Sequence, residues 1–105
     1  MIPDDAAVAE TKEVHIQDLL ERVMLEGASD LHLTTNAPPL IRVHGSLIRL
    51  EEYPMMNPAE IRRLIYGILT QRQREKLETE QELDLSYSLP GKARFRLNVY
   101  FQRDA

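Results

Sequence analysis

The sequence predicts one α+β domain, with helices packed on one side of a small antiparallel sheet. Three observations lead to this prediction. Two segments repeat apolar residues at spacings of three and four, as amphipathic helices do, and a third segment carries a helix-capping box. Four short segments alternate apolar and polar residues, as strands with one buried face do, and a fifth short segment follows a glycine turn as the second strand of a hairpin. No internal repeat or low-complexity linker interrupts the chain of 105 residues.

The first predicted element is a helix with one apolar stripe, and a short strand follows it. Gly27 suits the left-handed position that closes such a helix. In the strand, alternation directs Leu31 and Leu33 toward the core. It turns Asp30 and His32 toward the opposite face. The stripe of the helix consists of Ile16, Leu19, Leu20, Val23 and Met24.

A hairpin is predicted next. The prolines at 38–39 lead into a strand in which Ile41 and Val43 face inward. Gly45 then turns the chain into a second strand over residues 47–50.

Two helices with clear N-terminal signals follow the hairpin. Asn57 is a capping residue, Pro58 occupies the first helical position and Glu60 the third. Thr70 and Gln73 form a second capping box, which predicts a new helix from that point.

The last two strands are predicted over residues 83–89 and 93–101, with a turn at 90–91. The inward positions are Leu83, Leu85, Tyr87 and Leu89 in one strand and Ala93, Phe95, Leu97, Val99 and Phe101 in the other.

Composition narrows the function classes. The chain has 13 basic and 17 acidic residues and a formal net charge of −4, whereas nucleic-acid-binding domains normally show a net basic footprint. It has no cysteine, so it has neither disulfides nor a thiolate metal site, and a reduced cytoplasmic setting is expected. No apolar run approaches a membrane span, so no membrane insertion is expected.

The expected domain organisation is a flexible N-terminal tail over residues 1–12, without a secretory signal, and one folded domain over residues 13–103. The chain stops soon after a predicted strand, and we expect the intact product to be longer.

The sequence offers no set of catalytic or metal-ligating residues. It has no G-x-x-x-x-G-K-[ST] loop of the kind that holds nucleotide phosphates. Asp30 and His32 share a strand face, but the sequence positions no third ligand beside them, and we interpret them as a hydrogen-bonded pair. We therefore assign no catalytic, cofactor-binding or metal residue within the chain and expect no activity from it alone.

A basic strand face is the strongest candidate site. Arg94, Arg96 and Asn98 project from one face of the last strand, while Arg42 and Arg49 lie elsewhere in the small sheet. These residues form a basic, polar surface on an otherwise acidic domain.

Four motifs carry a resemblance to a known family. In this order, residues 28–33 (ASDLHL), 39–45 (PLIRVHG), 82–86 (ELDLS) and 93–99 (ARFRLNV) resemble the N-terminal domain of the PilT family. These are twitching-motility ATPases of the secretion ATPase superfamily that retract type IV pili. The chain departs from the family pattern at His44, where an aspartate is expected.

The resemblance implies a PAS-like fold and a place in a larger motor. Family members are homohexamers in which this domain precedes an ATPase domain with Walker A, Asp-box, Walker B and His-box elements. All of these are missing here, so ATP and magnesium belong to the parent chain. The implied partners are the ATPase domains of its own and neighbouring subunits and, indirectly, the inner-membrane pilus platform. The implied location is the cytoplasm, at the pilus base.

Two interpretations of the arginines are open. In the first, they pair with Asp84, Glu82 or another exposed carboxylate on a neighbouring strand. In the second, Arg94, Arg96 and their neighbours on the face contact nucleotide or the ATPase domain of an adjoining subunit, because the arginine fork suits phosphate and carboxylate.

The predicted function is a regulatory and subunit-assembly domain of a hexameric pilus-retraction ATPase, contributing to the nucleotide-site boundary between subunits. The alternative is a PAS-like small-molecule sensor or interaction module of a related secretion or pilus ATPase, which would require a cavity lined by polar groups. A nucleic-acid-binding module is a third class, and only the arginine strand favours it.

Overall fold

The computed structural model describes residues 14–89, 91 and 93–102. The predicted tail of residues 1–12, Pro90 of the turn and the inward direction of the Ala93 side chain lie outside what is described. In chain order, the elements are α2 (Ile16–Glu26), β1 (Asp30–Thr34), β2 (Leu40–Val43), β3 (Ser46–Arg49), α3 (Pro58–Ile65), the 3-10 turn η1 (Tyr66–Ile68), α4 (Gln71–Glu80), β4 (Glu82–Leu89) and β5 (Ala93–Tyr100). The predicted order of helices and strands is confirmed.

The five strands form one sheet in the order β3-β2-β1-β5-β4. The α+β fold class is confirmed, but the predicted antiparallel sheet needs one correction. The β1–β5 pairing is parallel, and the other three pairings are antiparallel. Side-chain alternation does not encode strand direction. The long connection between β1 and β5 gives the chain room to return alongside β1 in the same direction.

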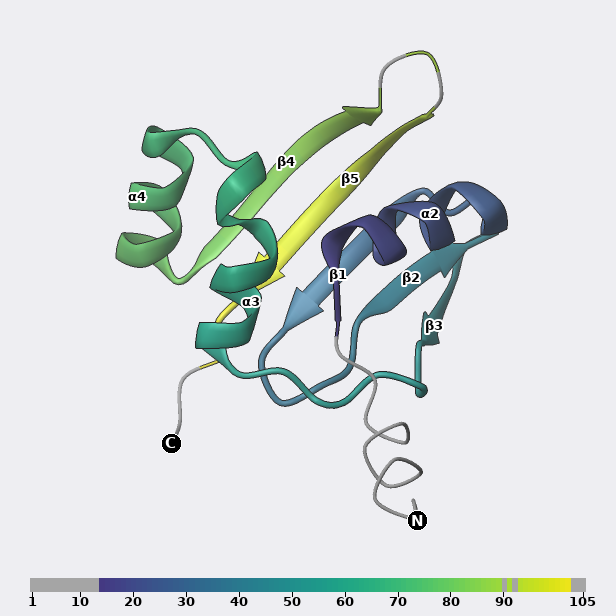
Figure 1. Cartoon of the computed structure of the whole chain (residues 1–105), viewed down its shortest axis with the longest axis horizontal. Helices are drawn as coiled ribbons and strands as arrows, with labels where there is room; N and C mark the ends of the chain where they lie inside the picture. The colour runs from purple at the N-terminus through teal and green to yellow at the C-terminus, as the bar shows by residue number, and fades with distance from the viewer. Residues whose placement is uncertain (1–13, 90, 92, 103–105) are drawn as a thin grey trace, which may run out of the picture.

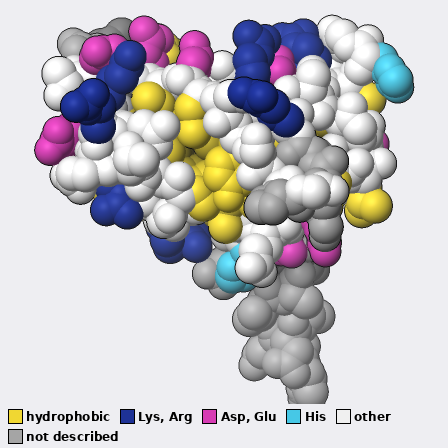
Figure 2. Space-filling model, turned by 90° about the horizontal axis from the view of Figure 1, so that it is seen from above, with side chains coloured by type: hydrophobic (Ala, Val, Ile, Leu, Met, Phe, Trp, Pro, Cys, Tyr) yellow, Lys and Arg dark blue, Asp and Glu magenta, His cyan; other side chains and the backbone are white. Residues whose placement is uncertain are grey.

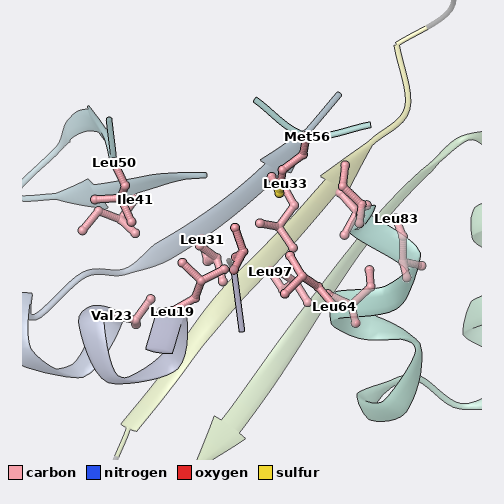
Figure 3. Close-up of a cluster of buried hydrophobic side chains, with 14 of the residues drawn as sticks. Leu19, Val23, Leu31, Leu33, Ile41, Leu50, Met56, Leu64, Leu83 and Leu97 are labelled. Carbon is pink, nitrogen blue, oxygen red and sulfur yellow. The ribbon is translucent and has the colours of Figure 1, made fainter. Parts of the chain in front are cut away.

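Among the described residues, the helices lie against one face of the sheet and none covers the other. In Figure 1, α2 and α3 lie over one face, α4 lies beside β4, and β4 and β5 form a long hairpin. Leu31, Leu33 and Leu97 point toward Leu19 of α2 and Leu64 of α3 in the core (Figure 3). All five side chains are buried, which confirms the predicted inward faces of these strands and helices.

The predicted helix ends are confirmed. Gly27 closes α2 with φ 66°, a left-handed conformation that costs little without a Cβ. The Asn57 side chain accepts from the Glu60 amide at 2.8 Å, and the Glu60 side chain accepts from the Asn57 amide at 3.2 Å. Thr70 and Gln73 form the same reciprocal pair at 3.1 and 2.9 Å.

The structure adds η1, which the sequence did not predict. The apolar repeat continues past Ile65, yet the α-helix ends there and a 3-10 turn follows. Gly67 in this turn is a poor helix former. Arg74 of α4 donates from Nε and Nη2 to the Tyr66 carbonyl at 3.0 and 2.6 Å, which satisfies a carbonyl at the helix end.

Part of the core reaches the surface. Several side chains are only partly buried where they pack against it, and Figure 2 shows apolar side chains gathered in the middle of one face with charged side chains around them. Among the described residues, no helix is both long and apolar enough to cross a membrane.

Candidate functional site

The candidate site lies on the sheet face opposite the helices. Leu31 of β1 and Leu97 of β5 are buried toward the core, so their neighbours Asp30 and Arg96 project from the other face. Arg42 of β2 lies opposite Asp30 on one side, and Arg96 lies opposite it on the other. Three adjacent strands thus place one carboxylate between two arginines.

Asp30 binds both arginines directly. Arg42 donates from Nε to Asp30 Oδ2 at 3.1 Å. Arg96 donates from Nε to Oδ1 and from Nη2 to Oδ2, both at 3.2 Å. The Asp30 side chain is only 3% exposed. A carboxylate removed from water to this extent is costly unless it is paired, and these hydrogen bonds supply the pairing.

The arginines keep donors available after they bind Asp30. The Arg96 side chain is 70% exposed and that of Arg42 is 35% exposed. Arg42 also donates from Nη1 to the Gly45 carbonyl at 3.1 Å, which ties it to the β2–β3 turn. A guanidinium has five N–H donors, so each group has more donors than these contacts use. We call Asp30, Arg42, Arg96 and the adjacent His32 the Asp30 cluster.

The structure brings together two of the four predicted site residues. Arg42 and Arg96 meet at Asp30, whereas Arg94 donates from Nε to Ser86 Oγ of β4 at 2.9 Å. Asn98 is half-buried and lies opposite His32 of β1. Arg94 and Asn98 lie on the same sheet face as the cluster. The hydrogen bonds to Asp30 come from Arg42 and Arg96 and from neither of these two residues.

The first interpretation of the arginines named the wrong partner. It paired them with Asp84, Glu82 or another exposed carboxylate, but Arg96 and Arg42 pair with a buried one. The predicted hydrogen bond between Asp30 and His32 is also wrong. His32 Nε2 lies 3.8 Å from Asp30 Oδ2, and it has no hydrogen-bond partner among the described atoms.

Asp30 is the residue that the sequence interpretation left out of the site. The alternation of apolar and polar residues in β1 already indicated that Asp30 lies on the same sheet face as the arginines. The missing information was the strand order, because β1 and β5 are separated by most of the chain and pair in parallel.

The surroundings of the cluster shift the pKa of its carboxyl group and the pKa of its imidazole. Burial raises the pKa of Asp30, but hydrogen bonds from Arg96 and Arg42 lower it by more, so it lies below its ordinary value of 3.8. Burial lowers the pKa of His32 below 6.5, with the two arginines adding to the effect and Asp30 opposing it. At neutral pH, two arginine charges and one carboxylate charge leave the cluster with a net charge of +1.

We expect the domain to lose stability as the pH falls from about 7.5 to about 5. The pKa of His32 in the folded chain lies below its ordinary 6.5, so the unfolded chain binds this proton more readily and protonation favours unfolding. The pKa of Asp30 acts with the same sign, but only as the pH falls below 3.8. Urea-unfolding midpoints at the two pH values check the prediction. His32→Gln should reduce their difference, and an undiminished difference would contradict the assignment to His32.

The described residues contain no group of three or more His, Cys, Asp or Glu side chains that could hold a metal ion. Asp30 and His32 are close together, but both carboxylate oxygens of Asp30 already accept from arginines. The cluster is chemically suited to binding an oxyanion, because it presents fixed N–H donors and net positive charge.

Comparisons with known proteins find sequence similarity to part of several pilus ATPases. No family model matches it. It is 41% identical over 87 residues to the type IV pilus retractation ATPase PilT of Pseudomonas aeruginosa, covering 83% of this chain and 25% of that protein. It is 28% identical over 91 residues to the type IV pilus ATPase PilU of the same organism, covering 87% and 24%. The chain thus spans about a quarter of the length of these relatives.

The fold comparison agrees with the sequence comparisons. The crystal structure of the pilus retraction motor PilT with bound ADP matches with a TM-score of 0.67 and 36% identity, covering 87% of this chain and 26% of that one. A twitching motility protein of Neisseria gonorrhoeae is 36% identical over 62 residues, which are 59% of this chain and 16% of that protein.

Proposed function

The chain is homologous to the PilT-like pilus ATPases and has the fold of their N-terminal domain, and on this basis we propose that it serves a hexameric ATPase as a regulatory and subunit-assembly domain. The motor so formed retracts type IV pili and drives twitching motility. It works in the cytoplasm, at the inner-membrane base of the pilus. The sequence similarity to PilT and PilU supports this proposal.

The observation that carries the proposal is the arginine pair, with Arg96 exposed and Arg42 half-buried, on the sheet face that none of the described helices covers. Arg96 is 70% exposed although its fork is fixed against Asp30. A fixed and accessible guanidinium is suited to receive a phosphate or carboxylate from outside the domain. We infer that this face meets a neighbouring subunit near its nucleotide, with Arg96 and Arg42 nearest the contact and Arg94 and Asn98 beside it.

ATP and magnesium act in the ATPase domain of the parent. This chain has no phosphate-holding loop of its own, so its residues contribute by contact across the subunit boundary. Positive charge there offsets the charge of the transferring phosphoryl group when nucleotide is bound. The domain's part in turnover is to place that charge and to order the boundary.

The buried core gives little support to the alternative function, a PAS-like small-molecule sensor. Among the described residues, the only buried polar or charged ones are Asp30 and Thr35. Asp30 is bound to the arginines, and the Thr35 hydroxyl accepts from the Gln102 amide at 2.7 Å. His32 Nε2 is a further buried polar atom in this part of the chain and has no hydrogen-bond partner there, but it lies beside Asp30 on the sheet face opposite the helices and not among the apolar side chains of the core.

Deleting the domain from the parent ATPase tests the proposal. We expect a parent that lacks residues 14–102 to lose hexamers in light scattering and to lose most of its ATP turnover, while its ATPase domain still binds nucleotide in a calorimetric titration. That binding is the control for a folded ATPase domain. Hexamers and turnover equal to those of the intact protein would contradict the proposal.

A further inference from the structure

We propose that Asp30 is a positioning residue, which holds the guanidinium groups of Arg96 and Arg42 in the orientation that receives an oxyanion at the subunit boundary. The inference rests on the proposed function and adds to it a residue that the candidate set did not contain. Asp30 acts only through the arginines, because its own side chain is almost completely buried.

The geometry of the cluster fixes the arginines more firmly than their exposure suggests. Arg96 meets both carboxylate oxygens of Asp30 through Nε and Nη2, and this bidentate contact sets the plane of its guanidinium as well as its place. Arg42 is held at two points, by Asp30 at Nε and by the Gly45 carbonyl at Nη1. The donors that remain on each group are therefore presented in one orientation.

Stability alone is a weak reason for a charge at this position. Well-packed apolar residues of similar volume are often as stabilising as a buried ion pair. An oxyanion site built from two arginines, by contrast, requires the two like-charged groups to be held near each other with their free donors directed outward. Asp30 meets this requirement, because it lies between Arg42 and Arg96 in register and leaves a net positive charge.

Asp30→Asn in the intact parent ATPase is the main test. Asparagine keeps the size of the side chain, but its NH₂ end cannot accept a hydrogen bond from arginine. We expect turnover at saturating ATP to fall about 100-fold, the loss that a misplacement on the order of 1 Å can cause. The KM for ATP should change less than kcat. Removal of a negative charge by itself would strengthen anion binding, so a loss of ATP turnover in this variant would not be explained by the change in charge alone.

Asp84→Asn is the matched control. Asp84 is exposed on β4 and lies opposite Asn98 on the same sheet face. The hydrogen bond to Asp30 is the main cause that raises the pKa of Arg96, and the charge of Asp84 adds to it. The hydrogen bonds of Arg96 go to Asp30 instead. The control variant removes the same charge without releasing a guanidinium, and its turnover should stay within about twofold of the unmodified protein.

A spectroscopic measurement separates positioning from a merely structural role. In the 105-residue chain, the Nε–H resonances of Arg42 and Arg96 should exchange slowly with solvent, remain slow in Asp84→Asn and be lost to exchange in Asp30→Asn. Asp30→Glu is the second variant if asparagine prevents folding. It keeps the charge but moves the carboxylate by one methylene, so turnover should still fall.

The outcomes distinguish this inference from the proposed function. If Arg96→Ala lowers turnover but folded Asp30→Asn and Asp30→Glu do not, the inference is overturned and the proposed function stands. If Arg96→Ala and Arg42→Ala also leave ATP turnover unchanged, the proposed contact of the arginines across the subunit boundary is contradicted. Unfolding of both Asp30 variants would assign Asp30 a structural role and overturn the inference. A fall in turnover within intact hexamers supports a phosphoryl oxyanion, and a fall through loss of hexamers supports a partner carboxylate.

Discussion

Replacing Arg96 by alanine in the parent ATPase should reduce ATP turnover by about 1000-fold or more if its guanidinium contacts the transferring phosphoryl group. Arginines supplied in trans in well-studied phosphoryl-transfer systems contribute about 10³ to 10⁵ in turnover. Arg96 is the most accessible member of the cluster and has its fork fixed by Asp30. Arg42→Ala should reduce ATP turnover by less, because Arg42 is less exposed and also donates a hydrogen bond to the Gly45 carbonyl.

This measurement needs a control for folding. Arg96 supplies two of the three arginine hydrogen bonds to the buried Asp30, so alanine will also weaken the domain. Turnover should be measured well below the melting temperature of the variant, which thermal unfolding of the 105-residue chain supplies. Arg96→Lys keeps the charge but loses the planar fork, and it should recover only part of the turnover. Full ATP turnover in folded Arg96→Ala hexamers would contradict the proposal that Arg96 contacts the nucleotide at the subunit boundary.

The predictions that succeeded depend on residues close together in the chain. A helix needs only its own periodicity and a cap, so Asn57 and Thr70 marked the starts of α3 and α4 correctly. The same holds for Gly27 at the end of α2 and for the alternation of β1 and β5. Each of these signals is complete within about ten residues.

The features that the sequence did not reveal depend on contacts between distant segments. Alternation placed Asp30 and Arg96 on one face, but their sequence separation is 66 residues, and only the parallel β1–β5 pairing makes them neighbours. Exposed acidic residues on the adjacent β4 were the obvious partners when strand order was unknown. The sequence therefore predicted the arginine face but not the carboxylate that organises it.

The buried stripe of α2 is the part of the sequence prediction with the largest expected effect on stability. Leu19 is completely buried, and Figure 3 shows it pointing toward Leu31 of the sheet. Leu19→Ala should lower the free energy of unfolding of the 105-residue chain by about 2–5 kcal/mol, because it removes buried methyl groups and leaves a cavity.

Leu25→Ala in the same helix is the matched control. Leu25 is 81% exposed, so the same change in side chain there removes almost no buried surface and should alter stability by less than about 0.5 kcal/mol. Since both variants replace leucine by alanine within α2, helix propensity changes equally and cancels in the comparison. The difference in urea-unfolding free energy therefore measures packing of α2 against the sheet. Equal losses at the two positions would mean that this helix does not pack against the sheet through Leu19.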